Sequence, residues 1–366
     1  MVEHAGDYEW RGEGEEAEVV LYAFGEGAAG SALGRILPIT RLPGVESPVH
    51  AAASPEGLGW VVTSASHAAP DLISRPERGL LLVADVPVEN LGMPPRGVMN
   101  VALRDFGEVG SLLPPLKDAG VRRFCEEGAP AAAEDGLIEE EDLSLLEPVV
   151  GDADALGRPA LAGGLRDWED RIGVDVRVVA EILDTDGAET LGLELGMLAL
   201  VVGVDAGDLG RLALAAHRER ILGRIRGGTD LGAQEDLPAA PTETEEAADL
   251  LAAVGAASNF ADGRAARTLY VLRRVLGDIA GGLSARAAWR VGGIEGHEGS
   301  LVHRRDLAAT GEGEVVVSGG SVAAGTGKMS GSVPPFGVPE DKGRHPWEEA
   351  GLLERWAALD RPESRA

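Results

Sequence analysis

The stretch that decides the interpretation of this chain is Val302-His303-Arg304-Arg305-Asp306-Leu307-Ala308-Ala309-Thr310, followed by Val315-Val316-Val317-Ser318-Gly319-Gly320-Ser321-Val322-Ala323. The first part predicts a strand that carries a His-Arg-Arg cluster, and the second predicts a strand that opens into a Gly-Gly-Ser turn. Backbone N–H groups in such a turn can face an anion, and a guanidinium group can donate two parallel hydrogen bonds to phosphate oxygens. The pattern therefore predicts a nucleotide or phosphate contact, for which a tight turn beside a polar strand end is the alternative. The residues predicted to make it are Gly319, Gly320, Ser321, Val322, His303, Arg304 and Arg305.

Length and composition limit what the chain can be. At 366 residues and 44% hydrophobic content it can bury a large core, as one large domain or two closely packed ones. No stretch approaches the roughly 18 apolar residues of a membrane helix, and the amino terminus is acidic, so we expect a cytoplasmic location and no membrane contact. The one cysteine, Cys125, excludes intramolecular disulfides and multi-cysteine zinc sites. Because glutamates follow it, Cys125 is predicted to be a half-buried helix residue, with a reactive thiol as the alternative.

The charge is strongly negative. Sixty-one acidic residues against thirty-three basic ones give a net charge of −28. Such a surface repels a phosphate backbone, which argues against DNA binding and against general RNA binding. Any RNA cleft would have to gather its arginines in one place, and we expect Arg218, Arg220, Arg304 and Arg305 to converge there. The alternative is that the carboxylates only keep the protein soluble.

The remaining sequence predicts a mixture of helices and strands. Apolar or β-branched runs predict strands at 18–24, 58–64, 79–86, 174–183, 197–204 and 212–216, the last leading into His217. A helical region is expected at 116–147, a connecting segment at 148–170 and a polar loop at 227–241. Thr242, with Glu245 three residues later, is a capping-box signature. An apolar stripe from Leu250 to Ile279 then predicts a long core helix. The tail is expected to be loop-rich, with a short helix at 347–359.

Four further segments occur in order before the opening stretch. They are Gly128-Ala129-Pro130-Ala131-Ala132-Ala133-Glu134-Asp135-Gly136, then Glu141-Asp142-Leu143 with Leu146-Glu147, then Leu214-Ala215-Ala216-His217, and Ala256-Ala257-Ser258-Asn259-Phe260-Ala261 with Arg264. Together these pieces resemble the RtcB family of RNA-splicing ligases. The family's segments are Gly-Ala-x-x-Ala-x-x-x-Gly, Glu-Asp-Leu-x-x-(Ile/Leu)-Glu, a strand ending in His-Ser-Gly-Ser-Arg, a helix with Asn-(Tyr/Phe)-Ala-x-x-Asn-Arg, and Val-His-Arg-Lys-Gly-Ala-Thr followed by Ile-Pro-Gly-Ser-Met-Gly. The resemblance covers about residues 40 to 325.

The resemblance implies a fold and a chemistry. It implies an α+β fold of mixed sheets with flanking helices, as one large compact domain over residues 36–325. An N-terminal strand region (1–35) precedes this domain and a loop-rich C-terminal tail (326–366) follows it. The family joins an RNA 3′-phosphate or 2′,3′-cyclic phosphate to a 5′-hydroxyl in tRNA splicing and RNA repair. It uses GTP, manganese and a histidine that becomes guanylated, so the resemblance implies GTP and manganese as cofactors and RNA ends or a protein as partners.

Most of the residues for that chemistry are missing. The family's Asp-x-x-Cys pair has no counterpart, because Pro70-Asp71-Leu72-Ile73-Ser74 lies in about the right place but has no cysteine. The family's Gly-Asn-His-Phe, the His-Asn before the His303 strand and the His-Gly-Ala-Gly-Arg guanylation motif have no counterpart. His217 is the one histidine that aligns with a metal ligand, and a capping or core role is its alternative. We therefore expect a catalytically degenerate relative, a pseudoenzyme that retains nucleotide or RNA-end binding. An active ligase with a rearranged site, and an unrelated acidic α/β protein that binds a phosphorylated metabolite, are the alternatives.

Overall fold

The computed structural model describes most of the chain up to residue 305 and short strands beyond it. The described residues are 2–4, 9–23, 26–54, 57–94, 97–98, 101, 105, 109–110, 113, 116–166, 172–181, 189, 192–297, 299–305, 307–310, 314–317 and 352–355. The turn predicted to contact a nucleotide, Gly319 to Val322, lies outside them.

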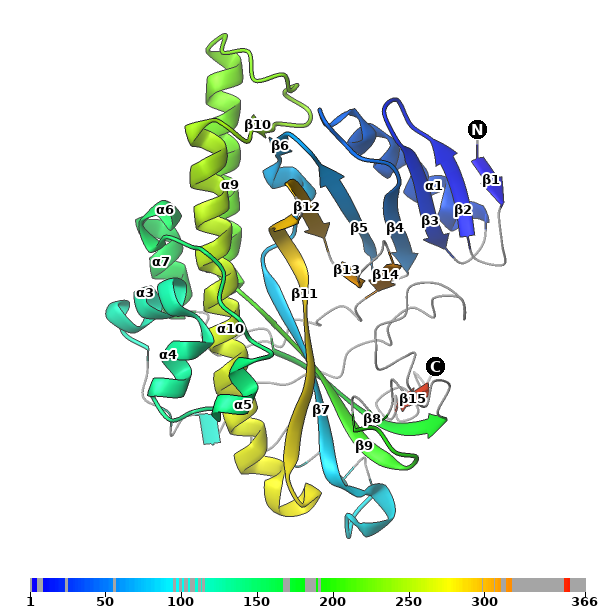
Figure 1. Ribbon diagram of the computed structural model, residues 1–366, viewed down its shortest axis with the longest axis vertical. Coiled ribbons are helices and arrows are strands. Elements are labelled where there is room, and N and C mark those ends of the chain that lie inside the picture. The colour runs from blue at the N-terminus through cyan, green and yellow to red at the C-terminus, as the bar shows by residue number, and fades with distance from the viewer. Residues whose placement is uncertain are drawn as a thin grey trace, which may run out of the picture.

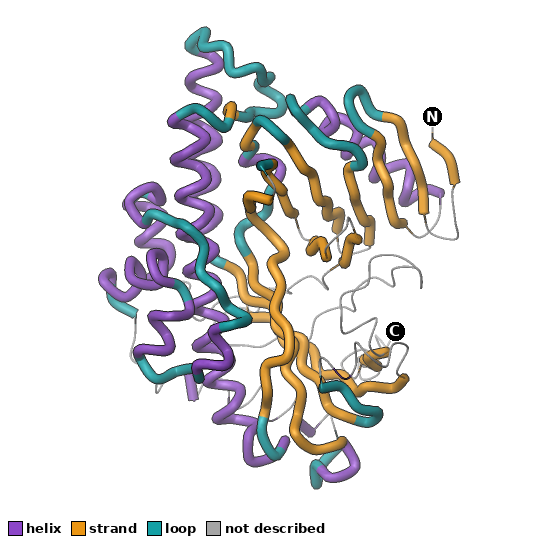
Figure 2. Tube along the Cα trace, viewed as in Figure 1, coloured by secondary structure: helices purple, strands orange, loops and turns teal. Residues whose placement is uncertain are grey.

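One mixed sheet of eleven strands organises these residues (Figures 1 and 2). In spatial order its strands are β1 (Val2–His4), β2 (Glu9–Glu13), β3 (Glu18–Ala23), β4 (Val49–Ser54), β5 (Gly57–Ser64), β12 (Ser300–Arg305), β11 (Leu283–His297), β7 (Glu77–Pro87), β9 (Met197–Asp205), β8 (Ile172–Glu181) and β15 (Leu352–Arg355). The β3–β4 pair is parallel and the other neighbours are antiparallel. Two small ladders pair β6 (His67–Ala68) with β10 (Ala240–Pro241) and β13 (Leu307–Thr310) with β14 (Glu314–Val317).

Strand β11 joins the two halves of the sheet. Its residues up to Gly292 pair with β7, and those from Gly293 onward pair with β12. A Cβ at Gly292 would collide with the carbonyl oxygen of Arg75, and Gly293 has a φ of +113°, in a region that side chains disfavour. The Gly292–Gly293 pair therefore permits a bend in β11, at which the strand passes from the β7 half of the sheet to the β12 half.

The predicted long helix is present as α10 (Glu245–Ala280). Thr244 caps it by accepting a hydrogen bond from the Ala247 amide at 3.3 Å, so the helix starts two residues later than the Thr242 signature predicted. Helix α9 (Gly207–Arg226) packs beside it (Figure 1). The shorter helices are α1 (Glu26–Ile36), η1 (Leu37–Arg41), η2 (Pro70–Leu72), η3 (Val88–Asn90), α3 (Asp118–Glu127), α4 (Ala129–Glu134), α5 (Glu140–Leu143), α6 (Ala153–Leu156) and α7 (Arg158–Arg166). None of the described helices is long and apolar enough to cross a membrane.

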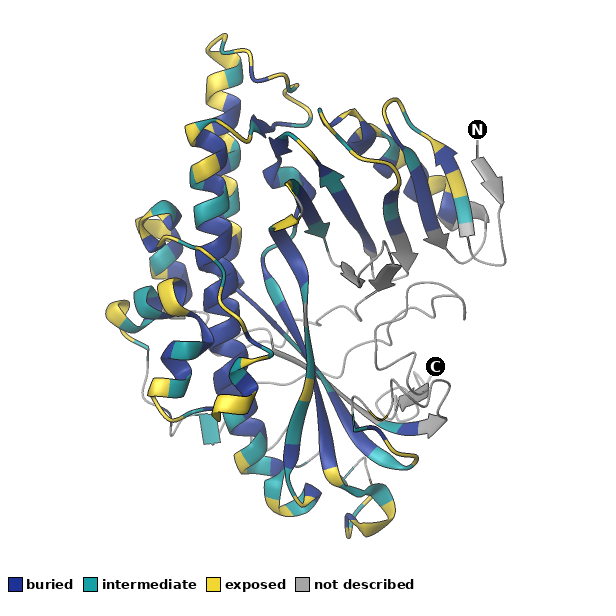
Figure 3. Cartoon of the chain, viewed as in Figure 1, coloured by how far each residue is buried: buried dark blue, intermediate teal, exposed yellow. Residues whose placement is uncertain are grey.

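Buried residues line both faces of the β7 region of the sheet (Figure 3): Leu80 and Leu82 belong to the core under the helices, and Leu81 and Val83 belong to a smaller core on the opposite face. The largest core packs the apolar stripe of α10, including Phe260, Leu269 and Leu272, against β7, β9 and the helices α3 to α7. A second core lies between α1 and strands β3 to β5. The described part of the chain is thus a mixed α+β structure, as the sequence predicted.

Several predicted elements differ from the structure. Residues 212–216 belong to helix α9, because Ala, Leu and Arg are good helix formers and no β-branched residue occurs between Gly207 and Glu219. The predicted connecting segment at 148–170 contains α6 and α7, and the predicted helical region at 116–147 is divided among α3, α4 and α5. Within the predicted tail helix the described residues form strand β15; the rest of it lies outside the described residues.

Candidate functional site

His303, the first residue of the predicted phosphate contact, points into the protein. It is fully buried on β12. Its Nε2 accepts a hydrogen bond from the Ala69 amide at 3.1 Å, and its Nδ1 lies 3.3 Å from the Val62 carbonyl oxygen, to which it donates. Burial lowers the pKa of His303 to about 4. Both ring nitrogens are therefore engaged by backbone, and the imidazole is neutral at pH 7.

The buried neutral state of His303 predicts a loss of stability in mild acid. An unfolded chain takes up a proton near the ordinary histidine pKa of about 6.5, whereas the folded chain takes it up only near 4. Stability is thus fully present above about pH 6.5 and falls by about 3 kcal/mol as the pH drops to about 4, at about 1.4 kcal/mol per pKa unit. Urea unfolding across this range measures the loss. His303→Gln does not titrate and should lack this part of the pH dependence; equal slopes for both proteins would contradict the assignment.

The four arginines expected to form an RNA cleft do not gather. Arg304 and Arg305 are neighbours on a strand, so they project from opposite faces. Arg304 pairs with Glu295, while the Arg305 guanidinium lies 4.8 Å from the centre of the Trp60 ring. On α9, Arg218 and Arg220 differ by about 200° around the helix. They pair with separate carboxylates, those of Asp71 and Asp249 respectively. The predicted convergence is therefore wrong, because acidic groups and a ring engage each cation separately.

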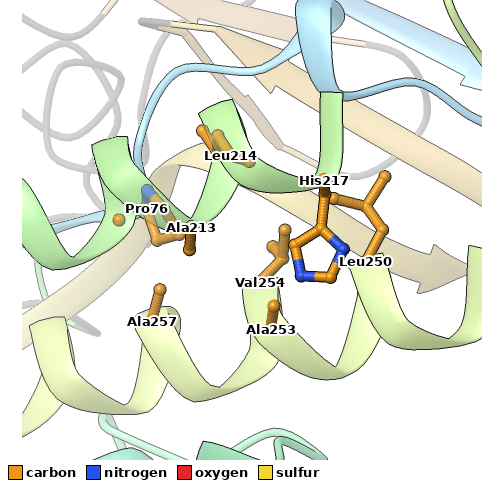
Figure 4. A pocket seen from close by; sticks show the side chains of 9 residues that line it. Pro76, Ala213, Leu214, His217, Leu250, Ala253, Val254 and Ala257 are labelled. Atoms are coloured by element: carbon orange, nitrogen blue, oxygen red, sulfur yellow. The ribbon is translucent and has the colours of Figure 1, made fainter. Parts of the chain in front are cut away.

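His217, the predicted metal ligand, lies in the middle of α9 and not at the end of a strand. It is 6% exposed, and its Nε2 lies 3.0 Å from the Ala155 carbonyl oxygen, to which it donates. Burial lowers its pKa. Figure 4 shows it at an apolar crevice between α9 and α10, which is lined otherwise by alkyl groups and is too narrow to admit water. Among the described residues no three His, Cys, Asp or Glu side chains are grouped as a metal ion requires. The described residues thus do not supply a manganese ligand set.

Three distant parts of the chain nevertheless meet at residues 69–74. The Asp71 carboxylate accepts hydrogen bonds from Arg218 Nε at 2.8 and 3.0 Å, which joins η2 to α9. Ala69 binds His303, and the Ser74 amide donates to the Arg304 carbonyl oxygen at 3.3 Å. We call this meeting point the 69–74 junction.

A buried charge network lies next to the bend of β11. Arg78 on β7 donates to both oxygens of Asp262 on α10, at 2.5 and 2.7 Å, and these side chains are 6% and 2% exposed. Arg290 lies 3.6 Å from Asp262 and donates to Glu295 at 2.9 Å. Arg304 donates to the other oxygen of Glu295. We call these five residues the arginine cluster.

The arginine cluster depends on the bend for its geometry. Residues five apart on a regular strand face opposite sides, yet Arg290 and Glu295 bind each other, because the Gly292–Gly293 bend lies between them. Burial alone would raise the pKa of Glu295, but Arg304 and Arg290 hold it below its ordinary value. Glu295 is therefore an anion at neutral pH, held between two guanidinium groups. The sequence analysis missed this cluster; its one local signal was Asp262, a charged residue within the apolar helix.

A second buried pair fixes the start of α9. The Asp205 carboxylate lies 2.6 Å from Arg75 Nε and accepts a hydrogen bond from the Gly207 amide at 2.8 Å. Arg264, which is fully buried on α10, donates to the Asp205 carbonyl oxygen. Arg264 thus ties α10 to the junction between β9 and α9, which is a structural role.

Asn259 and Cys125 also serve the structure. The Asn259 amide donates to the carbonyl oxygens of Cys125, at 3.1 Å, and Val149, at 2.8 Å, and its oxygen accepts from the Val149 amide. This ties α10 to the end of α3 and to the segment before α6. Cys125 is in a helix as predicted, but it is fully buried, and burial raises its pKa to about 12. Its thiol is therefore unreactive at neutral pH.

The chain matches no protein-family model. No curated protein sequence matches it at a significant level either.

Proposed function

We propose that this chain is a catalytically degenerate protein of the RtcB type, which binds a phosphate-ended RNA or a nucleotide without ligating it. The observation that carries the proposal is the 69–74 junction. Three segments of this chain lie where the resemblance places the family's metal and nucleotide residues. They are the segment around Asp71, which lacks the family's cysteine, the one at His217 and the one at His303-Arg304. These segments are more than 80 residues apart in sequence, and in the fold the segment around Asp71 contacts each of the other two.

The contacts at the junction support loss of catalysis. Manganese chemistry needs several His, Cys or carboxylate ligands around one ion. At the junction the Asp71 carboxylate binds Arg218, so a guanidinium takes the oxygens that an ion would need. His303 binds backbone groups, and His217 faces the apolar crevice. These partners favour a structural role for all three side chains over a role as metal ligands.

Packing along α10 supports the same relationship. The resemblance also includes the Gly128 segment and the helix that carries Asn259 and Arg264. In this chain Asn259 joins that helix to Cys125, just before Gly128, and to Val149, and its side chain lies beside Gly128, so two segments of the resemblance are in contact. The arginine cluster is equally compatible with the alternative, an unrelated acidic protein that binds a phosphorylated metabolite.

A guanylation assay tests the loss of catalysis. After incubation with labelled GTP and manganese, the purified protein should carry no covalent label, because the guanylation motif is missing and the described residues offer no ligand set. Dialysed protein should likewise retain no stoichiometric manganese. A covalent label that requires manganese would instead establish the active ligase with a rearranged site.

A binding assay tests whether the protein recognises a phosphate-ended RNA. Two oligonucleotides of one sequence are compared at low salt, one ending in a 3′-phosphate and the other in a 3′-hydroxyl. The phosphate-ended RNA should bind more tightly, since the acidic surface repels the common backbone and only the end differs. Equal affinities, or binding of neither RNA, would refute recognition of RNA ends.

A further inference from the structure

The arginine cluster contains more positive charge than its carboxylates neutralise. Among the residues that the structure describes, Arg78, Arg290 and Arg304 share two acidic partners, Asp262 and Glu295. The side chains of Arg290 and Arg304 are 16% and 13% exposed, so water screens them only in part. A cluster with one excess positive charge is therefore largely shielded from water in a chain whose net charge is −28. Removing a cation from water is costly, and cations inside the fold do not make the protein more soluble. The excess positive charge therefore calls for another explanation.

Two hydrogen-bond donors of this cluster also lack acceptors within the described part of the chain. The Nε atoms of Arg290 and Arg304 are buried, and neither has a hydrogen-bond partner among the residues that the structure describes. Both guanidinium groups bind the same carboxylate, Arg290 through Glu295 Oε1 and Arg304 through Glu295 Oε2, so they lie on either side of one anion. Buried donors without a partner are rare in folded proteins and commonly mark a bound water or ion.

We propose that Arg290 and Arg304 form a binding site for a phosphoryl group, with Glu295 as an internal competitor that occupies it in the absence of ligand. A tetrahedral phosphoryl group offers several oxygens, which suits two guanidinium groups that approach from different sides. The inference rests on the proposed function for the identity of the ligand: Arg290 and Arg304 would hold the phosphate of an RNA end or a nucleotide. Free inorganic phosphate has the same chemistry and is the other source.

The internal competitor explains how the site stays stable when it is empty. With Glu295 ionised, the cluster carries a single excess charge, and each guanidinium keeps one charge-assisted hydrogen bond. Glu295 is 28% exposed, more than either arginine, so its carboxylate can turn outward while the guanidinium groups remain in place. Arg290 is anchored independently, since its Nη2 donates to the Glu147 carbonyl oxygen at 2.9 Å. Phosphate affinity in the wild type should therefore be weak and limited by displacement of Glu295.

Removal of the competitor tests the site. Calorimetric titration with inorganic phosphate at low salt should show at least tenfold tighter binding to Glu295→Gln than to the wild type. Glu235→Gln is the matched control, because it also removes a glutamate that binds an arginine, Arg226, at 2.9 Å, but on the exposed surface. It should leave phosphate affinity unchanged. Adding Arg304→Gln to Glu295→Gln should abolish the gain.

The outcomes are distinct. A folded Glu295→Gln that binds phosphate no better than the wild type overturns the site, as does an equal gain in Glu235→Gln. If Glu295→Gln does not fold, wild-type melting decides: phosphate must raise Tm more than chloride at matched ionic strength, and equal Tm values overturn the site. Competition between phosphate and a 3′-phosphate oligonucleotide assigns the site to RNA ends. Phosphate binding without such competition keeps the site and removes only the proposed function.

Discussion

Replacing Asp262 by alanine should lower the free energy of unfolding by about 3–5 kcal/mol, enough to unfold a protein of ordinary stability. The substitution leaves the Arg78 guanidinium, whose side chain is 6% exposed, without the carboxylate that binds both of its donors. The charge cannot escape to water or lose its proton, because arginine remains ionised in proteins. Arg290 also loses an anion 3.6 Å away. Urea unfolding followed by circular dichroism measures the change.

Asp249→Ala is the matched control for this prediction. Asp249 is on the same helix and also binds an arginine, Arg220, but the pair is 36–40% exposed. Its loss should cost less than about 1 kcal/mol. Arg78→Met with Asp262→Leu should recover most of the stability lost in Asp262→Ala, because an apolar pair needs no desolvation of charge. Equal costs at positions 249 and 262 would show that the arginine cluster is solvated.

The elements that the sequence predicted well are those whose signals are local. The stripe runs along most of the 36 residues of α10, which make about ten turns, so one face of the helix was recognisable and its core position followed. Strands β5, β7 and β9 are runs of apolar and β-branched residues, and their bounds agree with the predictions within two residues. The α9 segment at 212–216 was assigned to a strand because it is a short apolar run, a pattern that a buried strand shares with a buried helix, although its residue types favour a helix.

The candidate sites depend on contacts that no local pattern encodes. Arg78 and Asp262 are 184 residues apart, and neither suggests a partner until the sheet and α10 are packed together. For His303 the strand assignment was confirmed, but alternation leaves open which face is buried. The structure places His303 beside Val62 on the buried face and Arg304 on the other. The histidine expected to contact phosphate is thus structural, and only one of its arginine neighbours joins the charge network.

The arginines inside the fold also change the meaning of the acidic composition. The net charge predicts that the protein surface repels phosphate, which is a long-range effect on approaching anions. A buried group of guanidinium ions acts at short range, where the low dielectric strengthens its interaction with an anion. An acidic protein can therefore exclude polyanions generally and still bind one terminal phosphate at the bend of β11.

Gly255→Ala should be the most disruptive single-methyl change in α10. A Cβ at Gly255 would overlap the carbonyl oxygen of Val150 and approach the Gly151 Cα to 3.1 Å. These are backbone atoms, and the Asp152 amide binds the Ala252 carbonyl oxygen at 3.1 Å, so the 150–152 segment cannot move away alone. Overpacking of this kind costs about 1–3 kcal/mol and occasionally more. Thermal unfolding should show a clear fall in Tm.

Gly277→Ala provides the opposite expectation on the same helix. A Cβ at Gly277 meets no atom within 4 Å, so the alanine adds no clash. It reduces the conformational entropy of the unfolded chain and so lowers the entropy lost when the helix forms. It should stabilise the protein by about 0.5–1 kcal/mol. The two substitutions add the same methyl group to α10 and should shift Tm in opposite directions. A shift of the same sign in both would contradict the close contact between α10 and the 150–152 segment, because helix propensity alone favours alanine at each position.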